Sequence, residues 1–165
     1  MIVQRFKIVE TKQDDVTHFE LTGCLDEDAR FPLINAGVTK EIVFDLEGLT
    51  AVNSVGIRTW MAWSSGLVAK NVKMSFERIP AFIVFKFNLM KGFFPKGATV
   101  KSLYVAFSCD KCSKDVNVLA DIRSHEAGDS IVDLAHLRAK ECGKSDCQLE
   151  PEMEESKYLV FLNRK

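Results

Sequence analysis

The alternation of apolar and polar residues in the first half of the chain predicts strands that alternate with helices. Two alternating runs, residues 3–9 and 16–21, flank a polar stretch at 11–15 and predict a β-hairpin. Residues 41–46 are apolar almost throughout, which is typical of a strand buried on both faces. An amphipathic helix is expected at 56–68, because its apolar residues recur at helical spacing.

The same patterns continue to about residue 107. A helix is expected at 27–36, where Gly37 would end it, although Pro32 lies inside this segment. The remaining elements are a strand at 72–76, a helix at 81–90 that begins after Pro80, a loop at 92–97 and a strand at 99–107. Strands in alternation with helices predict an α/β fold, with a mixed sheet packed against helices.

Beyond residue 108 the apolar spacing becomes sparse and turn residues are frequent, so we expect two domains, 1–107 and 108–165. Four of the five cysteines fall in the second part, as the pairs Cys109/Cys112 and Cys142/Cys147. Two short cysteine loops can supply four thiolates to one tetrahedral zinc ion. With strands expected at 99–107 and 158–162 on either side, this spacing predicts a zinc ribbon with a structural Zn²⁺.

Two other uses of the four cysteines stay open, a redox switch that releases zinc and disulfide bonding. His125 and His136 lie between the pairs and are expected at the surface. Cys24 stands apart, and we expect it to be a small buried apolar residue.

Composition narrows the function classes. The chain has 165 residues, 47% of them hydrophobic, and a net charge of −1, which argues against general binding to nucleic-acid phosphates. A ribbon that contacts nucleic acid remains the third alternative, but the acidic residues at 150–155 disfavour it. No signal peptide or apolar run long enough to span a bilayer is visible, so a cytoplasmic protein is expected. We expect no enzymatic activity, since no nucleophile–base pair or phosphate-binding loop is evident.

The most informative stretch is Asn53-Ser54-Val55-Gly56, which follows the apolar strand and begins the amphipathic helix. Free backbone N–H groups at a helix N-terminus favour anions and phosphoryl groups. A simpler role is also open, in which the Ser54 side chain caps the helix.

Three segments together resemble the STAS domain, the domain of anti-sigma-factor antagonists and of sulfate-transporter tails. They are Phe19-Glu-Leu-Thr-Gly-Cys-Leu-Asp26, Glu41-Ile-Val-Phe-Asp-Leu-Glu-Gly-Leu49 and Val52-Asn-Ser-Val-Gly-Ile57. The resemblance covers residues 1–107. It implies a domain that binds protein partners and a hydroxyl, immediately before the motif glycine, that a partner kinase phosphorylates. The whole chain resembles bacterial STAS-like proteins that carry a C-terminal zinc ribbon.

The chain departs from the STAS pattern at two positions: Asn53 stands where the family has Asp, and Val55 stands where it has the phosphoacceptor. The resemblance therefore implies a regulatory contact surface that phosphorylation at this position does not switch. The expected partner-binding residues are the motif and the outer face of the helix: Asn53, Ser54, Val55, Arg58, Thr59, Ala62 and Trp63.

The helix at 81–90 is apolar on two faces, of which only one can pack on the sheet. We expect the C-terminal module to cover the second face, and a homodimer or another partner is the alternative. The sequence thus predicts a non-catalytic interaction module of a bacterial signalling or assembly system. A zinc- or redox-responsive regulator is the second interpretation.

Overall fold

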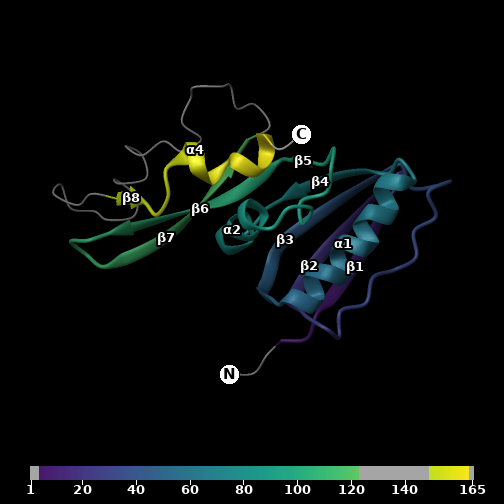
Figure 1. The fold of residues 1–165 in the computed structure, drawn as a ribbon, viewed down its shortest axis with the longest axis horizontal. Coiled ribbons are helices and arrows are strands. Elements are labelled where there is room, and N and C mark those ends of the chain that lie inside the picture. The colour runs from purple at the N-terminus through teal and green to yellow at the C-terminus, as the bar shows by residue number, and fades with distance from the viewer. Residues whose placement is uncertain (1–3, 123–148, 164–165) are drawn as a thin grey trace.

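A computed structural model describes residues 4–122 and 149–163, which form a mixed α/β protein with two β-sheets (Figure 1). The first sheet has five strands in the order β1-β2-β3-β4-β5, and the second has three in the order β7-β6-β8. In the first sheet, β1 is antiparallel to β2, and the other neighbouring pairs are parallel. The first sheet and its helices comprise β1 Lys7–Gln13, β2 Val16–Leu25, β3 Glu41–Val52, α1 Ser54–Ala69, β4 Lys73–Glu77, α2 Ala81–Leu89 and β5 Thr99–Val100.

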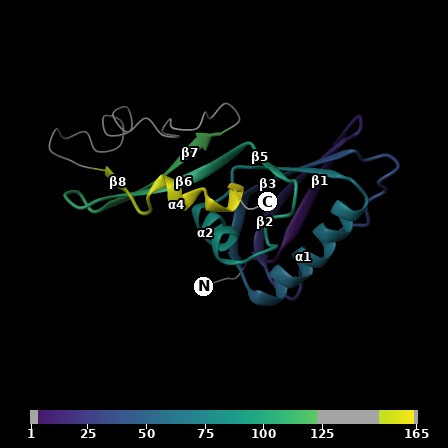
Figure 2. The same ribbon diagram turned by 45° about the horizontal axis from the view of Figure 1, so that its top comes forward.

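Both long helices lie on the same face of the first sheet (Figure 2). Alternate residues of the central strands point toward them, and a chain of aromatic contacts results. The Phe44 ring lies 5.1 Å from both the Trp60 ring of α1 and the Phe76 ring of β4. Phe76 in turn contacts Phe87 of α2 at 6.0 Å. This interlayer core holds α1 against the strands that precede and follow it.

The hairpin, the strand after it and the following helix are confirmed, with somewhat different limits. The hairpin turn contains only Asp14 and Asp15, and Asp14 adopts φ 54°. Strand β3 continues beyond the expected end at residue 46, because Gly48 and Leu49 still pair with Thr22 and Gly23 of β2. Helix α1 begins two residues earlier than expected.

The prediction of a helix at 27–36 is wrong. This segment is irregular, and tertiary contacts replace its helical hydrogen bonds. Phe31 stacks on Trp63 with 4.7 Å between ring centroids, and the Trp63 indole donates a hydrogen bond to the Pro32 carbonyl at 2.9 Å. The Arg30 guanidinium donates to two carbonyls of the segment, those of Glu27 and Ala29. The aromatic anchor and Pro32 outweigh helix propensity here.

The helix after Pro80 is confirmed as α2, with Pro80 just before its first turn. Its Ile83 and Phe87 side chains are buried. On another side, the Phe85 ring packs edge-on against Tyr158 at 5.6 Å, and Phe87 contacts Phe161 at 5.4 Å. The C-terminal segment therefore covers part of the second apolar face of α2, as expected, while Leu89 stays 78% exposed.

The second sheet consists of β6 Ser102–Cys109, β7 Lys114–Asp121 and β8 Leu149–Pro151. Residues 99–109 form one extended stretch that changes partner at Lys101. Strand β5 pairs with β4, whereas β6 pairs with β7 and β8, and a bridge between Ile79 and Leu103 connects the two sheets. The boundary predicted at 107/108 falls inside β6. Sequence analysis did not predict β7, although Val116, Val118 and Ala120 alternate with more exposed residues.

The prediction of a strand at 158–162 is wrong. A short helix, α4 Glu155–Tyr158, and a 3₁₀ turn, η1 Val160–Asn163, occupy this region. Tyr158 and Phe161 lie three residues apart and are both buried, which one helical face permits and one strand face does not. Within the described ranges 4–122 and 149–163, no helix is long and apolar enough to cross a membrane.

Candidate functional site

The N-terminus of α1 is capped by Asn53 rather than by Ser54. The Asn53 Oδ1 atom accepts hydrogen bonds from the backbone N–H groups of Val55 at 3.0 Å and Gly56 at 2.9 Å. Ser54 is the first residue of the helix, and it is exposed. The cap satisfies two of the free N–H groups that would otherwise attract an anion.

The other end of the Asn53 amide binds a carboxylate. Its Nδ2 atom donates to Glu27 Oε2 at 2.7 Å, and Glu27 lies in the loop after β2. A hydrogen bond from its own backbone N–H and the one from Asn53 hold the pKa of Glu27 below its usual range. An aspartate at position 53 could cap the helix but could not donate to Glu27. Sequence analysis missed Glu27, and the exchange of Asp for Asn at this position was the available signal.

The expected contact surface lies together on the outside of α1. Val55, Arg58 and Ala62 are exposed, with 37% of Val55 accessible, and Thr59 is half-buried. The Thr59 hydroxyl donates to the Val55 carbonyl at 3.1 Å, so it is already bonded within the helix. Ser65 and Gly66 extend the same surface toward the end of α1. The result is a face on which small side chains surround Arg58, bounded at one end by the capped motif.

Trp63 lies at the edge of this face but packs into the protein. Its ring contacts Phe31, Phe19 and Phe44, and its N–H is bonded to the Pro32 carbonyl. A partner can reach only the accessible edge of the half-buried ring. Trp63 therefore supports the flank of the surface more than it projects from it.

Cys24 lies near the motif and is half-buried rather than buried as expected. Burial and the negative charge of Asp26 raise the pKa of its thiol. The nucleophilic thiolate is therefore disfavoured, and this position lacks the environment of a reactive cysteine.

The first cysteine pair lies in the β6–β7 hairpin. Cys109 is the last residue of β6 and is buried, and Cys112 lies in the connecting turn and is half-buried. The Ser113 N–H donates to the Cys109 carbonyl at 2.8 Å, which closes the turn with Ser113 at φ 52°. Cys142 and Cys147, like His125 and His136, lie outside the described residues. Within ranges 4–122 and 149–163, no three potential metal-ligating side chains gather at one point.

A charged network that sequence analysis did not foresee links the two sheets. The Arg78 guanidinium binds the carboxylates of Asp45 and Glu47 on β3. The Tyr104 hydroxyl of β6 donates to the same Glu47 side chain, and this hydrogen bond, followed by burial, raises the pKa of Tyr104. The Tyr158 hydroxyl donates to the Tyr104 carbonyl. These acidic groups are bonded within the protein, which favours a structural role over a catalytic one.

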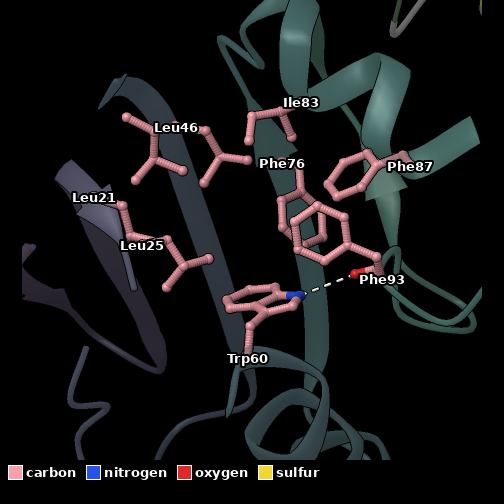
Figure 3. Close-up of a pocket in the computed structure, with 9 residues that line it drawn as sticks. Leu21, Leu25, Leu46, Trp60, Phe76, Ile83, Phe87 and Phe93 are labelled. Carbon is pink, nitrogen blue, oxygen red and sulfur yellow. Dashed lines mark hydrogen bonds between the residues drawn. The ribbon is translucent and has the colours of Figure 1, made fainter. Parts of the chain in front are cut away.

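A small apolar cavity of about 10 Å³ lies between the first sheet and its two helices (Figure 3). Beside it, the Trp60 indole donates to the Phe93 carbonyl at 2.9 Å and so fixes the loop after α2 (Figure 3). Only apolar and aromatic side chains line this cavity: Leu21, Leu25, Leu46, Leu49, Trp60, Phe76, Ile83, Phe87 and Phe93. Its volume is far below the roughly 300 Å³ of a ligand pocket, so it is a packing defect of the core.

Comparisons with known proteins identified no relative of this chain. Neither the scan against models of protein families, nor the search of curated proteins, nor the search of solved structures produced a match. The class that can be stated is thus that of the fold, a mixed α/β protein with a mixed sheet and few helices.

Proposed function

We propose that this protein is a non-catalytic interaction module of the STAS type, which binds a protein partner through the N-terminus and outer face of α1. The observation that carries the proposal is the Glu27–Asn53 pair. Asn53 accepts hydrogen bonds from two N–H groups of the helix N-terminus and donates one to Glu27. Beside this pair, the exposed Val55 stands where a STAS domain has its phosphoacceptor. A bacterial signalling or assembly system in the cytoplasm is the setting that the STAS resemblance implies.

Two structural features support a contact role. The outer face of α1 presents Arg58 together with the small residues Ala62, Ser65 and Gly66 on one helix, and a helix holds such groups in a fixed arrangement for a partner. The fixed negative charge of Glu27 stands beside the motif, so a partner would meet the same electrostatic surface at all times. In a phosphorylated STAS domain, by contrast, the added charge would eject the partner.

The test compares partner binding by wild type and by Val55→Asp. Aspartate near a helix N-terminus is compatible with the fold, since it interacts favourably with the helix dipole. It nevertheless adds charge at the motif end of the proposed surface. Val9→Asp is the matched control, because Val9 is 54% exposed and lies on β1, the edge strand of the first sheet, and not on α1.

The expected result is a protein that co-purifies with wild type and Val9→Asp and is lost with Val55→Asp, identified by mass spectrometry. Its affinity for purified Val55→Asp should fall by about tenfold or more, because the aspartate would be desolvated in the complex. Equal affinity for the two aspartate variants would refute the proposed surface.

A second candidate function rests on the cysteine hairpin. We propose that Cys109 and Cys112 contribute to a structural zinc site with Cys142 and Cys147. Oxidation of these cysteines would release the zinc ion. Leu149 of β8 pairs with Cys109 of β6. Cys147 precedes Leu149 by two residues, a length of chain that reaches at most about 7 Å. The pairing of Leu149 with Cys109 thus supports the proposal that the two cysteine pairs lie close enough to share one zinc ion.

Metal analysis of the purified chain tests this candidate. We expect about one zinc ion per chain, and about none in Cys109→Ser. Exposure to mild peroxide should release the zinc if the site is redox-responsive. A folded wild-type protein without zinc would disprove the site, and zinc that stays bound after cysteine oxidation would disprove the redox role.

A further inference from the structure

A groove of about 1000 Å³ lies at the C-terminal end of α2, on a part of the protein that the proposed α1 surface does not include. Three segments enclose it: the end of α2, the loop that follows and η1. Figure 2 shows η1 next to α2. The groove is large enough for several side chains of a bound segment.

Aromatic rings form its floor. Phe87, Phe94 and Phe161 contact one another, with centroid separations of 5.2 Å between Phe87 and Phe94, 5.4 Å between Phe87 and Phe161, and 5.1 Å between Phe94 and Phe161. Two leucines form apolar walls: Leu89 is 78% exposed and Leu162 is 38% exposed. Exposed leucines beside packed aromatic rings are typical of sites where a protein partner binds.

The groove is preformed, since hydrogen bonds fix the segment that carries Phe161. The Asn88 side chain of α2 accepts a bond from the Phe161 N–H at 2.9 Å and donates to the Tyr158 carbonyl at 2.8 Å. Because α2 and the C-terminal segment are far apart in the sequence, the groove exists only when the two are joined. A preformed site needs little ordering when a ligand binds.

Its rim is positively charged. Lys91 and Lys96 line the groove, and no acidic residue of the described ranges 4–122 and 149–163 does. Both lysines are exposed, and neither forms an ion pair with the described part of the chain. The sequence has no Asp or Glu between Glu77 and Asp110, despite the overall charge of −1. Lys91 and Lys96 therefore give the groove a positive rim.

We propose that this groove binds a short segment of a partner protein that presents apolar side chains flanked by Asp or Glu. The leucines and the aromatic floor would take the apolar side chains, and Lys91 and Lys96 would pair with the acidic groups. An anionic membrane surface offers similar chemistry, but a concave site accepts a protruding segment better than a flat bilayer. The groove thus gives the protein a second contact besides α1.

A phage-displayed library of short random peptides, selected on the full chain, provides the test. We expect enriched peptides to combine Leu, Phe or other apolar residues with at least one Asp or Glu. The dissociation constants of the enriched peptides are then measured by fluorescence anisotropy. Lys91→Glu/Lys96→Glu should weaken binding by about tenfold, since two exposed attractions become repulsions. Leu89→Asp should weaken binding further without loss of fold, because Leu89 is exposed.

Lys70→Glu/Lys73→Glu is the matched control, since it reverses two exposed charges outside the groove, and it should leave the peptide affinity unchanged. Val55→Asp should also leave it unchanged, which separates this site from the α1 surface. The proposal would be overturned by a failure to enrich peptides, by enriched peptides without acidic residues, or by equal affinity for the Lys91/Lys96 variant. If no peptide were enriched, and if the chain bound phosphatidylserine vesicles only while Lys91 and Lys96 were intact, the groove would be a membrane-binding site instead.

Discussion

The two sheets of this protein are stabilised in different ways. In the first, β2 buries alternate residues along most of its length, and α1 and α2 close one face over an aromatic core. In the second, β6 buries Leu103, Val105 and Phe107 in the same core, but Ala120 is the one buried residue of β7, so this sheet depends on what joins it to the rest. These connections are the continuous β5–β6 stretch, the Arg78 network and the C-terminal segment on α2. The first sheet should therefore tolerate loss of the second, and not the reverse.

The largest expected effect comes from a substitution where α1 meets the end of β2. A Cβ atom on Gly56 would lie 2.2 Å from the Leu25 carbonyl oxygen and 2.4 Å from its carbonyl carbon, both backbone atoms that cannot rotate away. Gly56→Ala should lower the free energy of unfolding by about 3 kcal/mol. Urea denaturation followed by tryptophan fluorescence would measure it.

Gly66 in the same helix is the control, since a Cβ there would meet nothing within 4 Å. Gly66→Ala should raise the free energy of unfolding by about 0.5–1 kcal/mol through higher helix propensity. If both alanine variants changed stability in the same direction, the close packing of α1 on β2 would be wrong.

The next effect separates the two sheets. Asn88→Ala removes hydrogen bonds to the Tyr158 carbonyl and the Phe161 N–H, which should weaken docking of the C-terminal segment by about 2 kcal/mol. Amide hydrogen exchange should accelerate at residues 155–163 and in β8, whereas β2 and β3 keep their protection. Asn117→Ala, on the exposed side of β7, should change neither. Equal acceleration in both sheets would show that they unfold as one unit.

A smaller effect follows from the tyrosines that connect the second sheet to the first. Burial raises the pKa of Tyr158, and the hydrogen bond to Glu47 raises that of Tyr104. A raised pKa means that the folded state favours the neutral phenol. Its contribution to stability is complete below about pH 10, the ordinary value, and is lost as pH rises toward the higher folded-state value. Tyr104→Phe should make unfolding less sensitive to alkaline pH, and an unchanged pH slope would argue against the bond to Glu47.

The smallest effect concerns the helix cap. Asn53→Ala should lower the free energy of unfolding by about 1 kcal/mol. Asn53→Asp keeps the oxygen that caps the helix, so it should lower this free energy by less. Both variants remove the donor to Glu27, so its pKa should rise, and more in Asn53→Asp, which adds a negative charge. Wild-type Glu27 contributes stability above its ordinary pKa that is lost as pH falls through its lowered folded-state value. Carboxyl titration by NMR would measure the shift, and an unchanged pKa in Asn53→Ala would contradict the pair.

The sequence predicted elements well where local patterns and the core agree. The apolar run of β3 is buried on both faces, as its pattern predicts, and the helical spacing of α1 places its apolar side on one of these faces, so pattern and packing coincide. The 27–36 segment failed because contacts distant in sequence decide its path: Phe31 stacks on Trp63, thirty-two positions later. The C-terminal segment failed for a similar reason, because its conformation is fixed by α2.

The candidate site shows the same limit. The residues on α1 came from the helical pattern and do lie on one exposed face. Glu27 could not be found in this way, since its bond to Asn53 depends on how the irregular loop returns to the helix. Arg78 and Tyr104 likewise meet at Glu47 only because the start of β6 pairs with Ile79, just after β4, at the junction of the two sheets.

The central claim, that a partner binds the outer face of α1, is tested most directly by photo-crosslinking in the cells that produce the protein. A photoreactive phenylalanine analogue replaces Arg58, at the centre of the face, or Lys73, an exposed position on β4. The account predicts one discrete crosslinked protein from position 58, absent from position 73 and abolished by Val55→Asp. The same adduct from both positions, or none from position 58, would contradict it.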